Sequence, residues 1–190
     1  DKAIDMVFET CERFTDKRIF LTDQLIHNPY INNKLREKGV HYLQRDTKNL
    51  LICGELQEGD VVVVSAFGTD FRDIQHLKEK GVTIVDSTCG AIINVWKRVE
   101  GYAKNGFITV VHGKKDHEET RATASQAVKE GGNYLIIENR QQAEELAQTI
   151  KSPSFEGKMG MANQTTMLKG ESLEIQDILK KAFIERFGEA

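Results

Sequence analysis

The stretch VVVVSAFGTDFRDIQHLKEKGVTIVDSTCG, residues 61–90, contains the patterns of a strand, a helix and a second strand in immediate succession. Residues 61–68 form an apolar, valine-rich run, which is typical of a strand buried on both faces of a parallel sheet. Residues 71–81 predict a helix that stops at a glycine, and residues 82–86 predict the next strand. A strand, a crossover helix and a parallel strand form the basic unit of an α/β fold.

The same alternation continues on both sides of this stretch. Further strands are expected at 18–22, 40–43, 107–113, 133–138 and 157–166, and helices at 1–14, 27–39, 91–106, 117–132, 139–150 and 171–188. Asn28 is the expected N-cap of one helix, with Pro29 in its first position. We therefore expect an α/β protein with mostly parallel sheets, made of two similar domains that meet near Cys89, at 1–89 and 90–190.

Composition excludes several classes of protein. Of the 190 residues, 39% are hydrophobic and 29% are charged, which is typical of a soluble globular protein, and no apolar stretch is long enough to span a bilayer. A formal net charge of -3 argues against the basic surface that nucleic-acid binding requires. The three cysteines lie far apart and no secretory signal opens the chain, so we expect a reducing, cytoplasmic setting and no membrane partner.

Polar and reactive side chains follow the predicted strands. They are His27, Thr69, Asp70, Cys89, His112, His117, Glu119, Thr165 and Thr166. Ligands of parallel α/β sheets bind at the carboxyl ends of the strands, so these side chains are candidates for a common site. Imidazoles and hydroxyls at helix N-termini suit a phosphate or diphosphate, and a carboxylic acid can deliver a proton. No zinc-ligand spacing, GxGxxG motif or Walker motif accompanies them.

The same residues also have structural interpretations. Glu119 can be the third residue of a capping box with Asp116 as the cap, and His117 can be a solvated residue of the same turn. His27 can shape the turn before a helix. Thr165 can be an ordinary strand-end residue. Cys89, taken alone, is more often a buried core thiol than a ligand.

Several stretches together resemble one enzyme family. They are LTDQLIHNPYIN (21–32), VVVVSAFGTDFRD (61–73), VDSTCGAIINVWKRVEGYAKNG (85–106), HGKKDHEETRATAS (112–125) and GMANQTTMLKGESLEI (160–175). Their ordered set resembles 4-hydroxy-3-methylbut-2-enyl diphosphate reductase, and the last stretch is similar to its plant and cyanobacterial branch. The resemblance covers essentially all 190 residues.

The resemblance implies a function, a cofactor and a set of site residues. The family has three similar α/β domains with pseudo-threefold arrangement, and each gives one cysteine to an iron-sulfur (4Fe-4S) cluster; Cys89 would be the middle ligand. His27 and His117 would contact the diphosphate, Glu119 would deliver a proton and Thr165 would lie near the substrate. The implied reaction is reductive dehydroxylation of 4-hydroxy-3-methylbut-2-enyl diphosphate to isopentenyl and dimethylallyl diphosphate, with ferredoxin or flavodoxin as electron donor.

The chain departs from the family pattern in two ways. Phe67 stands where many bacterial members have a histidine in a Ser-Ala-His-Gly stretch. The family's first and third cysteine motifs would lie before residue 1 and after residue 190, while Cys11 and Cys53 fall outside those motifs and are expected to be packing residues. We therefore expect a portion of the enzyme that lacks the third domain and, in isolation, is colourless and inactive.

Two other functions remain open at this stage. A short homologue could bind a diphosphate without redox chemistry, because His27, His117, Glu119 and Thr165 are all present. The chain could instead be an interaction domain in which these residues are structural.

Overall fold

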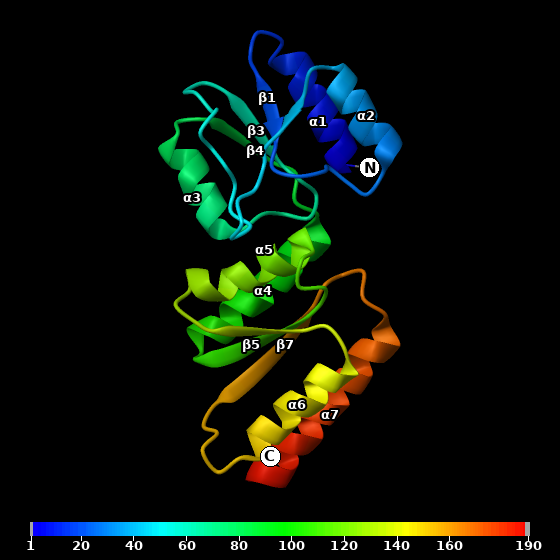
Figure 1. Cartoon of the computed structure of the whole chain (residues 1–190), viewed down its shortest axis with the longest axis vertical. Helices are drawn as coiled ribbons and strands as arrows, with labels where there is room; N and C mark the ends of the chain where they lie inside the picture. The colour runs from blue at the N-terminus through cyan, green and yellow to red at the C-terminus, as the bar shows by residue number, and fades with distance from the viewer. Residues whose placement is uncertain (1, 189–190) are drawn as a thin grey trace. The chain divides into compact units, whose positions relative to one another are not determined.

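The computed structural model describes residues 2–188, which divide into two compact units, one ending at Ile93 and the other beginning at Asn94 (Figure 1). The sequence pattern predicts this division four residues earlier, between residues 89 and 90. The first unit contains α1 (Lys2–Arg13), β1 (Ile19–Leu21), α2 (Pro29–Glu37), β2 (His41–Tyr42), β3 (Val61–Val64), α3 (Phe71–Glu79) and β4 (Thr83–Asp86). The helix α4 (Gly90–Lys104) crosses the division. The second unit continues with β5 (Phe107–His112), α5 (Glu118–Lys129), β6 (Tyr134–Ile137), α6 (Arg140–Lys151), β7 (Lys158–Asn163) and α7 (Lys169–Phe187).

The first unit is built on a four-stranded parallel sheet in the order β2-β1-β3-β4. Alternate residues of β3 point to opposite faces, as the period of a strand requires. Val61 and Val63 pack in the cluster that includes Leu35 of α2, whereas Val62 packs with Leu77 of α3. Helices α1 and α2 therefore cover one face and α3 covers the other (Figure 1). Burial on both faces explains why the valine run is apolar at every position.

The second unit is built on a parallel sheet in the order β6-β5-β7. Val110 of β5 packs with residues of α6 and α7 on one face, and Ala162 of β7 packs with residues of α4 and α5 on the other. Figure 1 shows the two helix pairs on opposite sides of this sheet. The expected α/β class with parallel sheets is confirmed.

Local sequence signals explain where several helices begin. The Asn28 side chain accepts hydrogen bonds from the backbone N–H groups of Tyr30 and Ile31, with Pro29 in the first helical position. This is the predicted cap of α2, because an asparagine side chain can satisfy N–H groups that have no partner inside the helix. Asn139 caps α6 in the same way by accepting from Gln142 N.

Among residues 2–188, no helix has the length and apolar character needed to cross a membrane.

Candidate functional site

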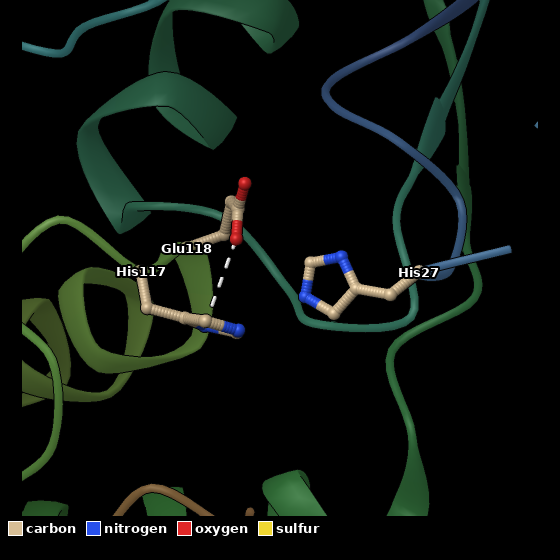
Figure 2. A group of neighbouring side chains, drawn as sticks. All are labelled: His27, His117 and Glu118. Carbon is tan, nitrogen blue, oxygen red and sulfur yellow. Dashed lines mark ion pairs between the residues drawn. The ribbon is translucent and has the colours of Figure 1, made fainter. Parts of the chain in front are cut away.

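The N-terminus of α5 is capped by His117. Its Nδ1 accepts a hydrogen bond from the Glu119 backbone N–H at 3.2 Å and lies 3.6 Å from Glu118 Oε2 (Figure 2). A ring nitrogen that accepts carries no proton, so the neutral imidazole has its proton on Nε2. The interpretation of Asp116 as the cap of this helix is wrong, because a histidine acceptor occupies that position.

Glu119 is the buried carboxyl group of this region. Its side chain is 1% exposed and accepts hydrogen bonds from two donors of Thr165, the backbone N–H at 2.5 Å and Oγ1 at 3.0 Å. In the part of the chain that the structure describes, no cation forms an ion pair with it. Burial raises the pKa of Glu119, and the two Thr165 hydrogen bonds offset part of that effect. Glu119 is thus a carboxyl group that favours its protonated form more than an exposed glutamate does.

The structure explains why Glu119 and Thr165 meet. Glu119 lies in the first turn of α5, which follows β5, and Thr165 lies in the turn that follows β7. Strands β5 and β7 are neighbours, with His112 paired opposite Asn163 at their carboxyl ends. Residues 46 positions apart are therefore brought into hydrogen-bond contact by strand pairing.

Gln164 is a site residue that the sequence analysis missed. Its side chain is buried and its amide bonds to Lys114, Thr120 and Thr166, which belong to three separate segments. The available signals were its place directly after a strand, next to two threonines, and its position inside the stretch 160–175 that carries the family resemblance. Glutamine is common after strands, so its position does not predict that the side chain is buried.

In the first unit, His27 lies beside Phe67. Their ring centroids are 4.4 Å apart and the rings are inclined by 30°. The loops that carry them are joined by a hydrogen bond from Ala66 N to Leu25 O at 3.1 Å. Phe67 therefore restricts the orientation of the exposed His27 imidazole, although a phenyl ring cannot itself donate to an anion.

Cys89 lies between β4 and α4 with an exposed side chain. Its backbone N–H donates to Ala66 O at 2.9 Å and its carbonyl accepts from Ile93 N at 3.1 Å, which holds it at the start of the helix. The interpretation of Cys89 as a buried core thiol is therefore wrong. Cys11 and Cys53 are half-buried against the two core clusters of the first unit, and burial raises the pKa of both thiols.

Three other polar residues at strand ends are structural. Thr69 donates to Asp73 Oδ2 at 3.1 Å, and Asp70 caps α3 by accepting from Arg72 N. His112 is fully buried, with Nδ1 2.9 Å from Ser172 Oγ, and burial lowers its pKa. The other ring nitrogen of His112, Nε2, lies 4.0 Å from Glu171 Oε2.

Comparison with known proteins identifies the family. The family profile described as LytB protein matches residues 1–188. The 4-hydroxy-3-methylbut-2-enyl diphosphate reductase of Picosynechococcus is 35% identical over 99% of this chain and 51% of the relative, and that of Gloeobacter violaceus is 35% identical over 100% and 50%. The chain thus spans about half the length of the curated relatives it matches.

Two solved structures share the fold. The structure of (E)-4-hydroxy-3-methyl-but-2-enyl diphosphate reductase, described as the terminal enzyme of the non-mevalonate pathway, matches with a TM-score of 0.76 and 23% identity, over 93% of this chain and 58% of that one. The Plasmodium falciparum E-1-hydroxy-2-methyl-but-2-enyl-4-diphosphate reductase matches with a TM-score of 0.79 and 22% identity, over 97% and 53%. Because the family profile matches residues 1–188 of the 190 residues of this chain, the chain belongs to the LytB protein family.

Proposed function

We propose that this chain supplies part of the active site of an iron-sulfur reductase that removes the hydroxyl group of 4-hydroxy-3-methylbut-2-enyl diphosphate and releases isopentenyl and dimethylallyl diphosphate. The observation that carries the proposal is the buried Glu119 carboxyl, held by Thr165 without a cation. A carboxyl group with a raised pKa suits the delivery of a proton to a departing hydroxyl, which then leaves as water. The names of the relatives support the same reaction.

Cys89 fits the role of one cluster ligand. Cluster cysteines bind as thiolates, so the thiol must be accessible, and Cys89 is exposed at a strand end. Cys11 and Cys53 do not fit, because they are half-buried in core clusters and burial disfavours their thiolates. The other ligands of the cluster would therefore come from residues outside this chain. When bound, the cluster supplies the two electrons that the reaction requires.

His117 and His27 are proposed to bind the diphosphate. With Nδ1 accepting from the helix backbone, His117 can donate its Nε2–H to a phosphate oxygen. His27 is exposed and its ring orientation is restricted by Phe67. Thr165 is exposed as well, so it can hold the Glu119 carboxyl and still be reached by a substrate.

A second candidate is a homologue that binds diphosphate without redox chemistry. It is favoured by one observation: His27, His117, Glu119 and Thr165, which are proposed to act on the substrate and not to hold the cluster, are all present. An electron donor of the ferredoxin or flavodoxin type and a cytoplasmic setting belong to the reductase proposal and remain predictions.

One experiment tests the proposal against this alternative. The complete protein of the source gene is purified without oxygen, its visible absorption is recorded, and reduction of the substrate is followed with a reduced viologen dye. We expect a brown, active protein that loses its colour on Cys89→Ser and keeps its colour but loses turnover on Glu119→Gln. The surface variant Glu100→Gln, which removes only a pair with Lys129, should keep both.

A colourless protein that binds the diphosphate would favour the non-redox homologue. Full turnover by the Glu119→Gln variant would contradict the role of the carboxyl group.

A further inference from the structure

We propose that Gln164 is a positioning residue, whose buried amide holds the Thr165 turn against the start of α5 and so fixes the contact between Thr165 and Glu119. The local geometry stands by itself, and its consequence for catalysis rests on the proposed function of Glu119. Thr165 and Thr166 are exposed, so burial of their own side chains cannot hold this turn in place.

The buried side chain of Gln164 holds the turn that contains Thr165 and Thr166. Its side chain is 3% exposed, and Oε1 accepts from Lys114 N at 3.0 Å and from Thr120 Oγ1 at 3.1 Å. Its Nε2 donates to Thr166 Oγ1 at 2.7 Å. One amide thus joins the loop after β5, the first turn of α5 and the turn after β7.

The network also determines which residue type is needed. A backbone N–H can only donate, so the atom that faces Lys114 N must be an acceptor, and the remaining amide nitrogen faces the hydroxyl of Thr166. Leucine has a similar size but would remove the acceptor of the Lys114 N–H and of the buried Thr120 hydroxyl, which is unfavourable.

The backbone of Gln164 completes the attachment. Its N–H donates to His112 O at 2.8 Å, which extends the pairing of β5 and β7, and its carbonyl accepts from Met167 N at 3.1 Å. These two backbone hydrogen bonds of Gln164 hold the turn that contains Thr165. The Thr165 N–H donates to Glu119. A small movement of this turn would remove both donors from the carboxyl group at once.

Gly113 shows how closely these segments approach. A Cβ atom at Gly113 would lie 2.5 Å from Thr120 Oγ1 and 2.8 Å from Gln164 Cβ. Both distances are far shorter than a van der Waals contact, so any side chain at position 113 would displace Gln164 or Thr120. The absence of a side chain at Gly113 is thus required for the Gln164 amide to reach Lys114 N.

The test follows the ionisation of Glu119 itself. The 190-residue chain is labelled with ¹³C at glutamate carboxyl carbons, the Glu119 signal is assigned from its loss in Glu119→Gln, and its titration is followed by NMR in the wild type and in Gln164→Leu. We expect Glu119 in Gln164→Leu to titrate at higher pH, because misplaced Thr165 donors stabilise the carboxylate less. In the active complete protein, the same variant should lower kcat about tenfold with little change in KM, the fold-change that corresponds to one lost hydrogen bond.

Gln142→Leu is the matched control. Gln142 also accepts a backbone N–H, from Glu138 at 2.8 Å, but at the start of α6 and away from Thr165. It should leave the Glu119 titration unchanged. If Gln164→Leu does not fold, Thr166→Val replaces it, because Thr166 is exposed and its loss removes only the acceptor of Gln164 Nε2.

An unchanged Glu119 titration in a folded Gln164→Leu or Thr166→Val chain would overturn the proposal, as would an equal shift in Gln142→Leu. A shift confined to the Gln164 and Thr166 variants supports it even if the wild type proves to have no reductase activity. The positioning role and the proposed function can therefore fail separately.

Discussion

Two buried carboxyl groups, one in each unit, are held in opposite ways. Asp73 in the first turn of α3 is 0% exposed and accepts from Arg45 Nη1 at 2.9 Å, Thr69 Oγ1 at 3.1 Å and Leu51 N at 2.9 Å. Glu119 in the first turn of α5 is 1% exposed, and within residues 2–188 its hydrogen-bond donors both belong to Thr165. The two groups occupy similar places on similar elements, and the difference between them is a cation.

On the proposed function, that difference distinguishes a structural carboxyl group from one that takes part in the reaction. An arginine beside a buried carboxylate compensates its charge, and the group attaches the segments that supply its partners. Asp73 thus attaches the segment from Arg45 to Leu51, which has no regular strand or helix, to α3. Without a cation, burial favours the neutral acid, so Glu119 can hold a proton and release it.

Glu119→Gln should have the largest effect on activity. The amide keeps the size of the side chain but has no acidic proton, so turnover should fall by about 100-fold to 10,000-fold, the range for a general acid. Turnover of the complete enzyme at saturating substrate measures this effect. A loss of turnover smaller than about tenfold would contradict the proposed role of Glu119 as a proton donor.

Asp73→Asn should mainly lower stability. The substitution removes the buried partner of Arg45 and leaves the pair with Asp23 at 3.4 Å, so we expect a cost of about 2 kcal/mol in the free energy of unfolding. Urea denaturation measures the loss, with the surface substitution Glu100→Gln as a control expected to cost under about 1 kcal/mol. Equal costs for both substitutions would mean that Asp73 is not the attachment point described above.

The pH dependence of stability should also distinguish Glu119. Its pKa in the folded chain is raised above the ordinary value of 4.5, so the folded chain binds this proton more tightly than the unfolded chain. The resulting stabilisation is complete below pH 4.5 and is lost as the pH rises through the folded pKa. Within that window the wild type should lose stability relative to Glu119→Gln by at most about 1.4 kcal/mol per pH unit.

Parallel urea denaturation of the wild type and of Glu119→Gln, from pH 4 upward in steps, measures this difference. If the gap between them does not change with pH, the burial of Glu119 does not perturb its ionisation.

Thr165→Val should have the smallest effect. It removes the Oγ1 donor to Glu119 but keeps the backbone N–H, so about 1 kcal/mol of stabilisation of the carboxylate is lost. The Glu119 pKa should rise further and turnover should fall roughly fivefold. Thr165→Ser keeps the donor and should behave like the wild type, whereas equal losses in both variants would point to a role of the methyl group.

Much of the fold could be predicted from local patterns. The valine run of β3 and the Asn28 cap of α2 are encoded by residues adjacent in sequence, and the structure confirms both. The capping interpretation of Asp116 was wrong because histidine is rarely considered as an N-cap, although its Nδ1 accepts as a side-chain oxygen does. Gln164 was missed for a different reason, since its partners Lys114 and Thr120 lie 50 and 44 residues away, in segments that no local pattern connects to it.

The sequence by itself determined the α/β class, the order of strands and helices, and the presence of histidine, carboxyl, hydroxyl and thiol groups after the strands. These features depend on short-range periodicity and on the rule that parallel strands end at the same edge of a sheet. Only the tertiary structure decided which carboxyl group is paired with a cation and which is not. Burial and pairing arise between residues far apart in the chain, as the contacts of Asp73 with Arg45 and of Glu119 with Thr165 show.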